Sequence, residues 1–171
     1  MVIDASVAMA IIRDEANGPQ AAAAMARWTR NAVRIVVPSH FWLEVTNSLM
    51  RRHRLSGAAV LEGIHGLDQF GLETMQVDRP MLVSAIDLAE RHRLTSYDAA
   101  YLALADAIDG ALLTFDNALR AAAGARAVGV DGHRLSDAPA PYEHDVTWPS
   151  YKGASAYLAK LRAQARATSA S

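Results

Sequence analysis

The stretch VRIVVPSHFWLEVTNSLM, residues 33–50, joins a predicted strand to a predicted helix. β-branched residues dominate positions 33–37, and Pro38 ends the run, which is typical of a strand that stops there. Ser39 is a favoured helix N-cap, so we expect a helix over residues 40–53. One strand followed directly by one helix is the repeating unit of α/β proteins.

Glu44 lies inside this predicted helix, next to its apolar face. Helical spacing predicts a buried face made of Phe41, Trp42, Val45 and Leu49. Glu44 is about 60° from Phe41 on a helix of 3.6 residues per turn, so it borders that face. A surface glutamate paired with Arg51 or Ser48 is the alternative, and the spacing leaves both interpretations open.

The same alternation extends in both directions from this unit. We expect strands at 1–4, 33–37, 73–77, 111–115 and 126–130, and helices at 6–15, 20–30, 40–53, 56–70, 79–92, from Thr95 or Ser96, and from Asp116. This order predicts an α/β fold with a central, mostly parallel sheet flanked by helices. The composition changes near residue 136, so we predict a domain over 1–137 and an extension over 138–171 with a terminal helix.

The overall composition limits the possible functions. The chain has 171 residues, is 51% apolar, carries a net charge of −1 and contains no cysteine. A thiolate metal site, a cysteine nucleophile and a global basic field for nucleic acid are therefore excluded. No apolar run is long enough to span a bilayer, and no signal peptide is visible, so we expect no membrane association and a cytoplasmic location.

Four carboxylates stand at positions where an acid needs an explanation: Asp4, Glu44, Asp98 and Asp116. Asp4 ends the predicted strand 1–4 and Asp116 follows the predicted strand 111–115, and open parallel sheets bind ligands beyond the carboxyl ends of their strands. Helix capping is the alternative for both. Asp98 falls in the first turn of a helix whose sequence is otherwise strongly apolar. The helix dipole favours such an acid by only about 0.3–1 kcal/mol, whereas burying an unpaired carboxylate costs several times more.

If the four acids converge, their mutual repulsion requires protons or cations. At about 5 Å and an effective dielectric constant near 20, each pair repels by roughly 3 kcal/mol. Oxygen ligands with little imidazole or thiolate suit Mg²⁺ or Mn²⁺. Such an ion can clamp phosphate oxygens and activate water, which is the chemistry of metal-dependent nucleases and phosphatases.

Four motifs in this order resemble those of PIN domains, and most closely those of the VapC-type toxins of toxin–antitoxin pairs. The motifs are VIDASV, VPSHFWLEVTNSL, LTSYDAAYLALA and LLTFDNAL. The resemblance implies a PIN-like three-layer fold and an Mg²⁺- or Mn²⁺-dependent endoribonuclease. It also implies an RNA substrate, a cognate antitoxin and a homodimer. The residues that match the acidic quartet are Asp4, Glu44, Asp98 and Asp116, and those that match the pocket hydroxyls are Ser6 and Thr114.

Substrate phosphates require positive charge, and the sequence offers few candidates. Arg51, Arg52 and Arg54 form one basic group, with Arg13 as a weaker candidate. A solvated helix end is the alternative for the first three.

Two other functions remain open. A non-catalytic PIN-like binding module is one. A haloacid-dehalogenase-like phosphatase is the other, although that pattern requires an Asp where this chain has Ser6. We expect all six histidines to be structural or exposed.

Overall fold

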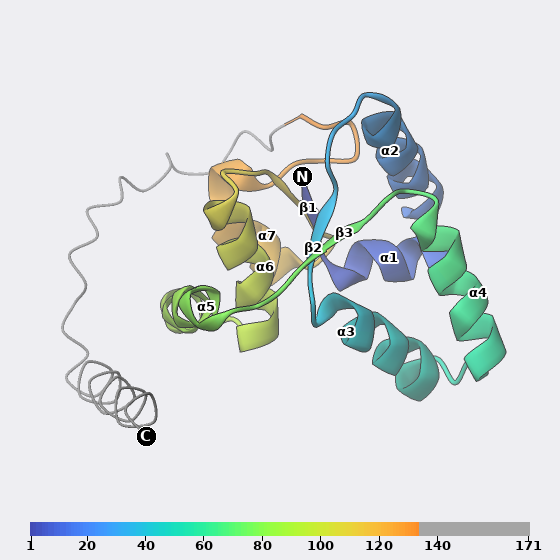
Figure 1. Ribbon diagram of the computed structural model, residues 1–171, viewed down its shortest axis with the longest axis horizontal. Coiled ribbons are helices and arrows are strands. Elements are labelled where there is room, and N and C mark those ends of the chain that lie inside the picture. Colours follow the sequence, from blue (N-terminus) through green and yellow to red (C-terminus); the bar gives the residue numbers. More distant parts are fainter. Residues whose placement is uncertain (134–171) are drawn as a thin grey trace, which may run out of the picture. The chain divides into compact units, whose positions relative to one another are not determined.

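The sheet predicted from the sequence is present and entirely parallel in a computed structural model, which describes residues 1–133 (Figure 1). Four strands in the order β3-β2-β1-β4 form it. Their bounds are β1 Val2–Ile3, β2 Val36–Pro38, β3 Glu73–Met75 and β4 Leu112–Leu113. Val2 pairs with Val36 on one side and with Leu112 on the other, so β1 is central. The predicted α/β class is therefore confirmed.

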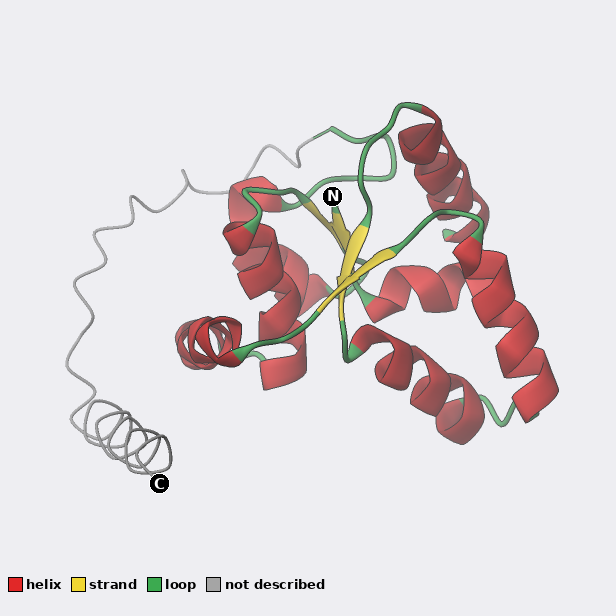
Figure 2. Ribbon diagram, in the orientation of Figure 1, coloured by secondary structure: helices red, strands yellow, loops and turns green. Residues whose placement is uncertain are grey.

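Helices cover both faces of this sheet, which gives three layers (Figure 2). The helices are α1 Ala5–Ile12, α2 Gly18–Arg30, α3 Phe41–Asn47, α4 Gly57–Asp68, α5 Arg79–His92, α6 Ser96–Ala107 and α7 Asn117–Ala123. A π-helical turn, η1 Ser48–Arg52, continues α3, and a 3₁₀ turn, η2 Gly124–Arg126, follows α7. Every residue from Ala99 to Ala105 of α6 is buried, so this helix is a rigid centre of one layer.

Two local predictions are wrong. The first is the Ser39 cap: His40 occupies the N-cap position of α3 without a side-chain hydrogen bond, and the Ser39 hydroxyl accepts from the Val77 N–H. Gly18 and Pro19 begin α2, where the Gly18 Cα packs against the carbonyl of Ala10 too closely for any Cβ.

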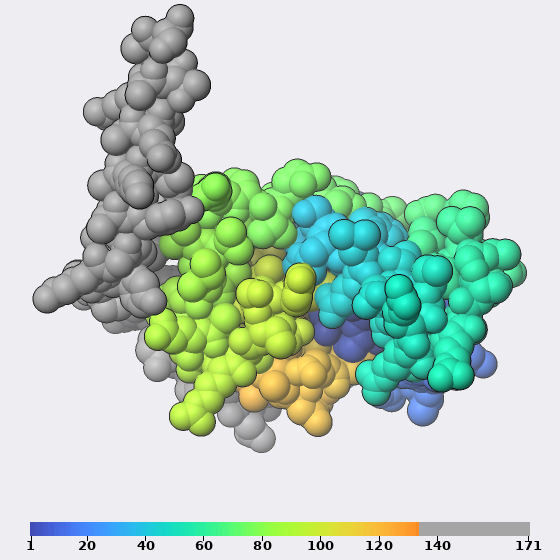
Figure 3. All heavy atoms as spheres, turned by 90° about the horizontal axis from the view of Figure 1, so that it is seen from below, coloured from blue at the N-terminus to red at the C-terminus, as the bar shows by residue number. Residues whose placement is uncertain are grey.

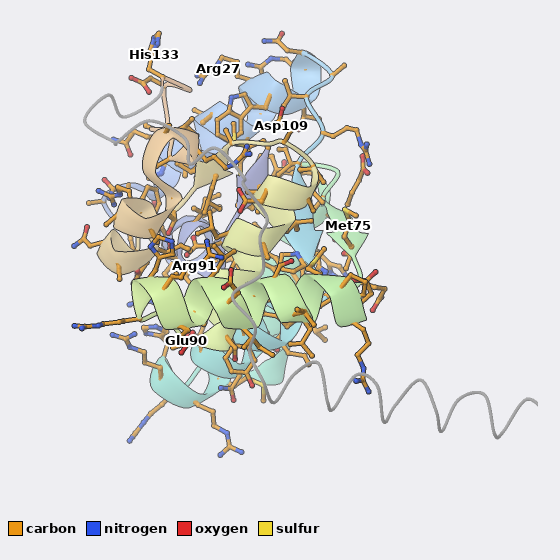
Figure 4. All side chains as sticks on the ribbon, turned by 90° about the vertical axis from the view of Figure 1, so that its left-hand side faces the viewer. Arg27, Met75, Glu90, Arg91, Asp109 and His133 are labelled. Carbon is orange, nitrogen blue, oxygen red and sulfur yellow. The ribbon has the colours of Figure 1, made fainter. Side chains whose placement is uncertain are left out.

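The strand expected at 126–130 shrinks to a single bridge between Leu112 and Ala127. The chain leaves the sheet there because the Gly129 N–H bonds to the His133 carbonyl in a turn instead of continuing the ladder. At the same end of the fold Arg27 of α2 donates to the Val130 carbonyl at 2.8 Å (Figure 4).

The predicted boundary at 137/138, the extension and its terminal helix lie outside the described residues. Among residues 1–133, no helix has both the length and the apolar character needed to cross a membrane.

The carboxyl ends of all four strands lie at one edge of the sheet because the strands are parallel. Figure 3 looks onto this edge, where the blue N-terminal segment lies between the cyan start of α3, the yellow-green start of α6 and the orange start of α7. Each of the four candidate acids belongs to one of these segments. Ligand sites of open parallel sheets form at this edge.

Candidate active site at the carboxyl edge of the sheet

Asp4 is the most deeply buried of the candidate acids, and it occupies the N-cap position of α1. Its residue is 4% exposed, and although it precedes α1 its side chain makes no capping hydrogen bond. The carboxylate instead accepts from the Ser6 hydroxyl at 2.6 Å and from the Thr114 hydroxyl at 2.9 Å. Burial raises the pKa of Asp4 to about 7, and the charge of Glu44 adds to this effect. The two hydroxyls therefore fix a carboxylate that the protein holds at an energetic cost.

Glu44 is partly buried on α3, and its partner is neither Arg51 nor Ser48. The Tyr101 hydroxyl on α6 donates to Glu44 Oε2 at 2.7 Å. Burial raises the pKa of Glu44, and the negative charge of Asp98 raises it further. Tyr101 thus connects the two helices and orients one oxygen of Glu44.

Asp98 lies at the rim of the buried helix α6. Thr95 is the N-cap: its hydroxyl accepts from the Asp98 N–H at 3.1 Å and donates to Asp98 Oδ2 at 2.7 Å. Asp98 is half-buried, whereas Asp4 is buried. The argument that a buried carboxylate needs partners therefore applies to Asp4 and not to Asp98. The negative charge of Asp98 raises the pKa of Glu44, so the two carboxylates interact electrostatically.

Asp116 differs from Asp4 although both follow a strand. It caps α7, with Oδ1 accepting from the Leu119 N–H at 2.7 Å, and it is exposed. Its own N–H donates to the Thr114 hydroxyl, which also bonds to Asp4. The Ser6 hydroxyl accepts in the same way from the Phe115 N–H. Asp116 is therefore linked to the buried acid through one shared hydroxyl.

His40 and Tyr101 belong to this site, and the sequence interpretation missed them. The His40 ring packs on Tyr101 and Tyr97 at centroid distances of 5.0 and 5.7 Å. Its Nε2 is buried without a hydrogen-bond partner among residues 1–133. Burial lowers the pKa of His40, which favours the neutral ring. The available signal was position: His40 directly precedes the helix of Glu44, and Tyr101 follows Asp98 by one helical turn.

The candidate arginines lie apart from the acids. Arg13 pairs with Glu15, so a neighbouring carboxylate neutralises its charge. Arg51 and Arg52 are exposed on η1, about 10 Å along the helix axis from Glu44. Arg54 is exposed and has a left-handed backbone conformation just beyond η1. This basic group flanks the site at a distance and is not part of it.

The donor chemistry of the site suits a hard divalent cation. Within residues 1–133, no three acidic or histidine side chains stand close enough to form a complete metal cage. Mg²⁺ does not require one, since it commonly binds through one or two carboxylates and keeps several water ligands. Burial is the main cause that raises the pKa of both Asp4 and Glu44, so the charged form of each acid is costly at this edge.

Comparisons with known proteins agree with this architecture. The family model of the PIN domain matches residues 1–125. Ribonuclease VapC3 of Pyrobaculum aerophilum is 32% identical over 123 residues, which cover 70% of this chain and 91% of that protein.

Two solved structures share the fold. PAE2754 from Pyrobaculum aerophilum has a TM-score of 0.58 at 23% identity, covering 76% of this chain and 83% of its own. Mycobacterium tuberculosis VapC20, described as a toxin that cleaves the sarcin–ricin loop, has a TM-score of 0.57 at 18% identity, covering 71% and 93%. The chain belongs to the PIN-domain family and is one of its VapC-type members.

Proposed function

We propose that this protein is an endoribonuclease that depends on Mg²⁺ or Mn²⁺ and acts in the cytoplasm as the toxin of a toxin–antitoxin pair. The observation that supports this most strongly is Asp4. A carboxylate that is buried and held by two hydroxyls, without a side-chain capping hydrogen bond, is costly for the fold, and such perturbed carboxylates occur preferentially at functional sites. In a VapC-type PIN domain, a divalent cation and RNA are the corresponding ligands.

The residues have separate roles in this proposal. Asp4, Asp98 and Asp116 hold the ion directly or through water, and Glu44 binds a further ion or orients the attacking water. A bound divalent ion neutralises the carboxylates and acidifies water for attack on a phosphodiester. Ser6 and Thr114 restrain both oxygens of Asp4, and Tyr101 restrains Glu44. The hydroxyls thereby set the orientation of the acids before RNA binds.

RNA contacts outside the acidic site are assigned to the exposed arginines Arg51, Arg52 and Arg54, with Arg13 contributing little because it is paired. Each phosphate contact adds salt-dependent affinity without sequence information.

The RNA-cleavage proposal is tested directly with the purified chain. A mixed pool of single-stranded RNA is incubated with Mg²⁺, with Mn²⁺ and with excess chelator, and the products are separated by length. We expect cleavage with either ion and none with chelator. No cleavage of any RNA, together with no stabilisation of the fold by Mn²⁺, would show instead a non-catalytic binding module. The haloacid-dehalogenase alternative is set aside because the chain belongs to the PIN-domain family.

Partner proteins are also part of the proposal: a cognate antitoxin and a second copy of this chain. Helix α5 runs across the front of the view in Figure 4, and its apolar residues Leu82 and Ile86 are 41% and 54% exposed. They lie one turn apart on the same face. Burying them in a symmetric dimer removes this apolar surface from water.

The expected dimer is checked by sedimentation of the wild type and of the Leu82→Lys, Ile86→Lys double variant. We expect a dimer for the wild type and a folded monomer for the variant, because two charges at a two-fold interface repel their copies. A wild type that stays monomeric at high concentration would contradict this interface.

A further inference from the structure

A cavity opens beside the acidic site, lined by residues of α2, α7 and the segment that follows β4. Its volume is about 290 Å³, close to the lower end of roughly 300 Å³ for small-molecule pockets. We call it the edge pocket. Its polar groups come from the start of α2, from the end of β4 and from α7, and are Asn17, Gln20, Thr114 and Arg120. Most of the remaining wall is apolar and includes Phe115 and Val128.

The edge pocket and the acidic site share a wall. Thr114 lines the pocket, and its hydroxyl donates to Asp4 Oδ2 at 2.9 Å. Phe115 also lines the pocket, and its N–H donates to the Ser6 hydroxyl at 2.9 Å. The two sites therefore meet at Thr114 and Phe115, which line the pocket and also bond to the residues of the acidic site.

Two of the polar side chains of the pocket, those of Arg120 and Asn17, are not used in ion pairs or helix capping among residues 1–133. Arg120 forms no ion pair among residues 1–133. Asn17 occupies the N-cap position of α2, but its side chain makes no capping hydrogen bond. Amide side chains of Asn and Gln both donate and accept, so they can match the polar edge of a nucleobase. The apolar wall suits the face of the base, and the guanidinium of Arg120 suits a phosphate or a stacked base.

We propose that the edge pocket binds one nucleotide of single-stranded RNA next to the cleaved bond, and that Asn17 and Gln20 set the base preference there. This inference rests on the proposed ribonuclease function and deepens it. Recognition of single-stranded RNA commonly holds unstacked bases against aromatic or guanidinium groups and reads their edges by hydrogen bonds. A volume of about 290 Å³ is of the size of a small-molecule pocket, which suits a single nucleotide.

The test uses full-length protein and short RNA oligonucleotides that differ in one base at each position flanking the cut. Arg120→Gln is expected to raise KM about tenfold with little change in kcat, which is the loss of one charged contact of about 1.4 kcal/mol. The double variant Asn17→Ala, Gln20→Ala is expected to reduce base discrimination at one flanking position about tenfold. Arg30→Gln is the matched control, since Arg30 is exposed at the other end of α2.

The outcomes separate this inference from the proposed function. A wild type that cleaves no RNA contradicts the proposed function itself. A wild type that cleaves RNA, with pocket variants that match Arg30→Gln in KM and base preference, overturns the inference alone. If the pocket variants retain cleavage and base preference but lose inhibition by an antitoxin, the pocket binds a protein side chain and the inference is wrong. An unchanged thermal midpoint for each variant excludes misfolding, and the Asn17 and Gln20 variant provides the test if Arg120→Gln does not fold.

Discussion

Asp4→Asn is expected to reduce RNA cleavage at least about a hundredfold and, without divalent ions, to make the protein more stable at pH 8. Burial raises the pKa of Asp4 from 3.8 to about 7. Between these values the folded state binds more protons than the unfolded state, so stability falls as pH rises from about 4 to about 7. The complete loss corresponds to roughly 4 kcal/mol and is present at pH 8. Asparagine carries no charge, so the variant does not lose this stability as the pH rises.

Two measurements check this expectation. Thermal unfolding in chelator should give Asp4→Asn a midpoint on the order of 10 °C above wild type at pH 8, with little difference at pH 4. Mg²⁺ should stabilise the wild type and not the variant, because it binds only the charged site. Cleavage should fall at least about a hundredfold.

The control for this prediction is Asp68→Asn, an exposed acid of α4. It should change neither stability nor cleavage appreciably. A wild type whose stability stays flat between pH 4 and pH 8, with no gain in the variant, would show that Asp4 is not a destabilising carboxylate. A fully active Asp4→Asn protein would remove Asp4 from the site.

Local sequence patterns predicted most of the fold and failed where one contact decided the outcome. The alternation of strands and helices in the sequence was sufficient to predict the parallel sheet. Apolar periodicity and helix caps such as Thr95 and Asp116 depend only on residues within one element, so the sequence shows them directly. The strand expected at 126–130 failed because β-branched composition does not reveal that Gly129 enters a turn. Ser39 failed as a cap because its hydroxyl bonds to Val77, 38 residues away in sequence.

The candidate site shows the same division between local and distant contacts. Sequence identified Asp4 and Asp116 as equivalent acids after strands, yet one is buried and held by hydroxyls while the other caps a helix. The difference depends on Thr114, 110 residues from Asp4. The pairing of Tyr101 with Glu44 spans 57 residues. No spacing rule relates positions so far apart, so the partners of the acids required the structure.

Asp98→Asn is expected to reduce RNA cleavage at least about a hundredfold while the protein keeps its fold. Asparagine retains the backbone N–H that Thr95 accepts and an oxygen that can accept from the Thr95 hydroxyl. The variant loses only the charge, which costs about 0.3–1 kcal/mol at the N-terminus of α6. Removing that charge also lowers the pKa of Glu44 toward its ordinary value, since Asp98 helps to raise it.

The matched control for this change is Asp78→Asn, because Asp78 is an acid at the start of α5 whose side chain accepts from the Met81 N–H at 2.9 Å. Both variants remove one negative charge from a helix N-terminus, so thermal unfolding should show similar, small losses of stability. Cleavage of the same RNA with added Mg²⁺ or Mn²⁺ should then separate them, with Asp78→Asn close to wild type. Full activity in a folded Asp98→Asn protein would mean that Asp98 serves only its helix. Equal losses of activity in both variants would mean that the helix dipole, and not a ligand of the acidic site, accounts for the effect.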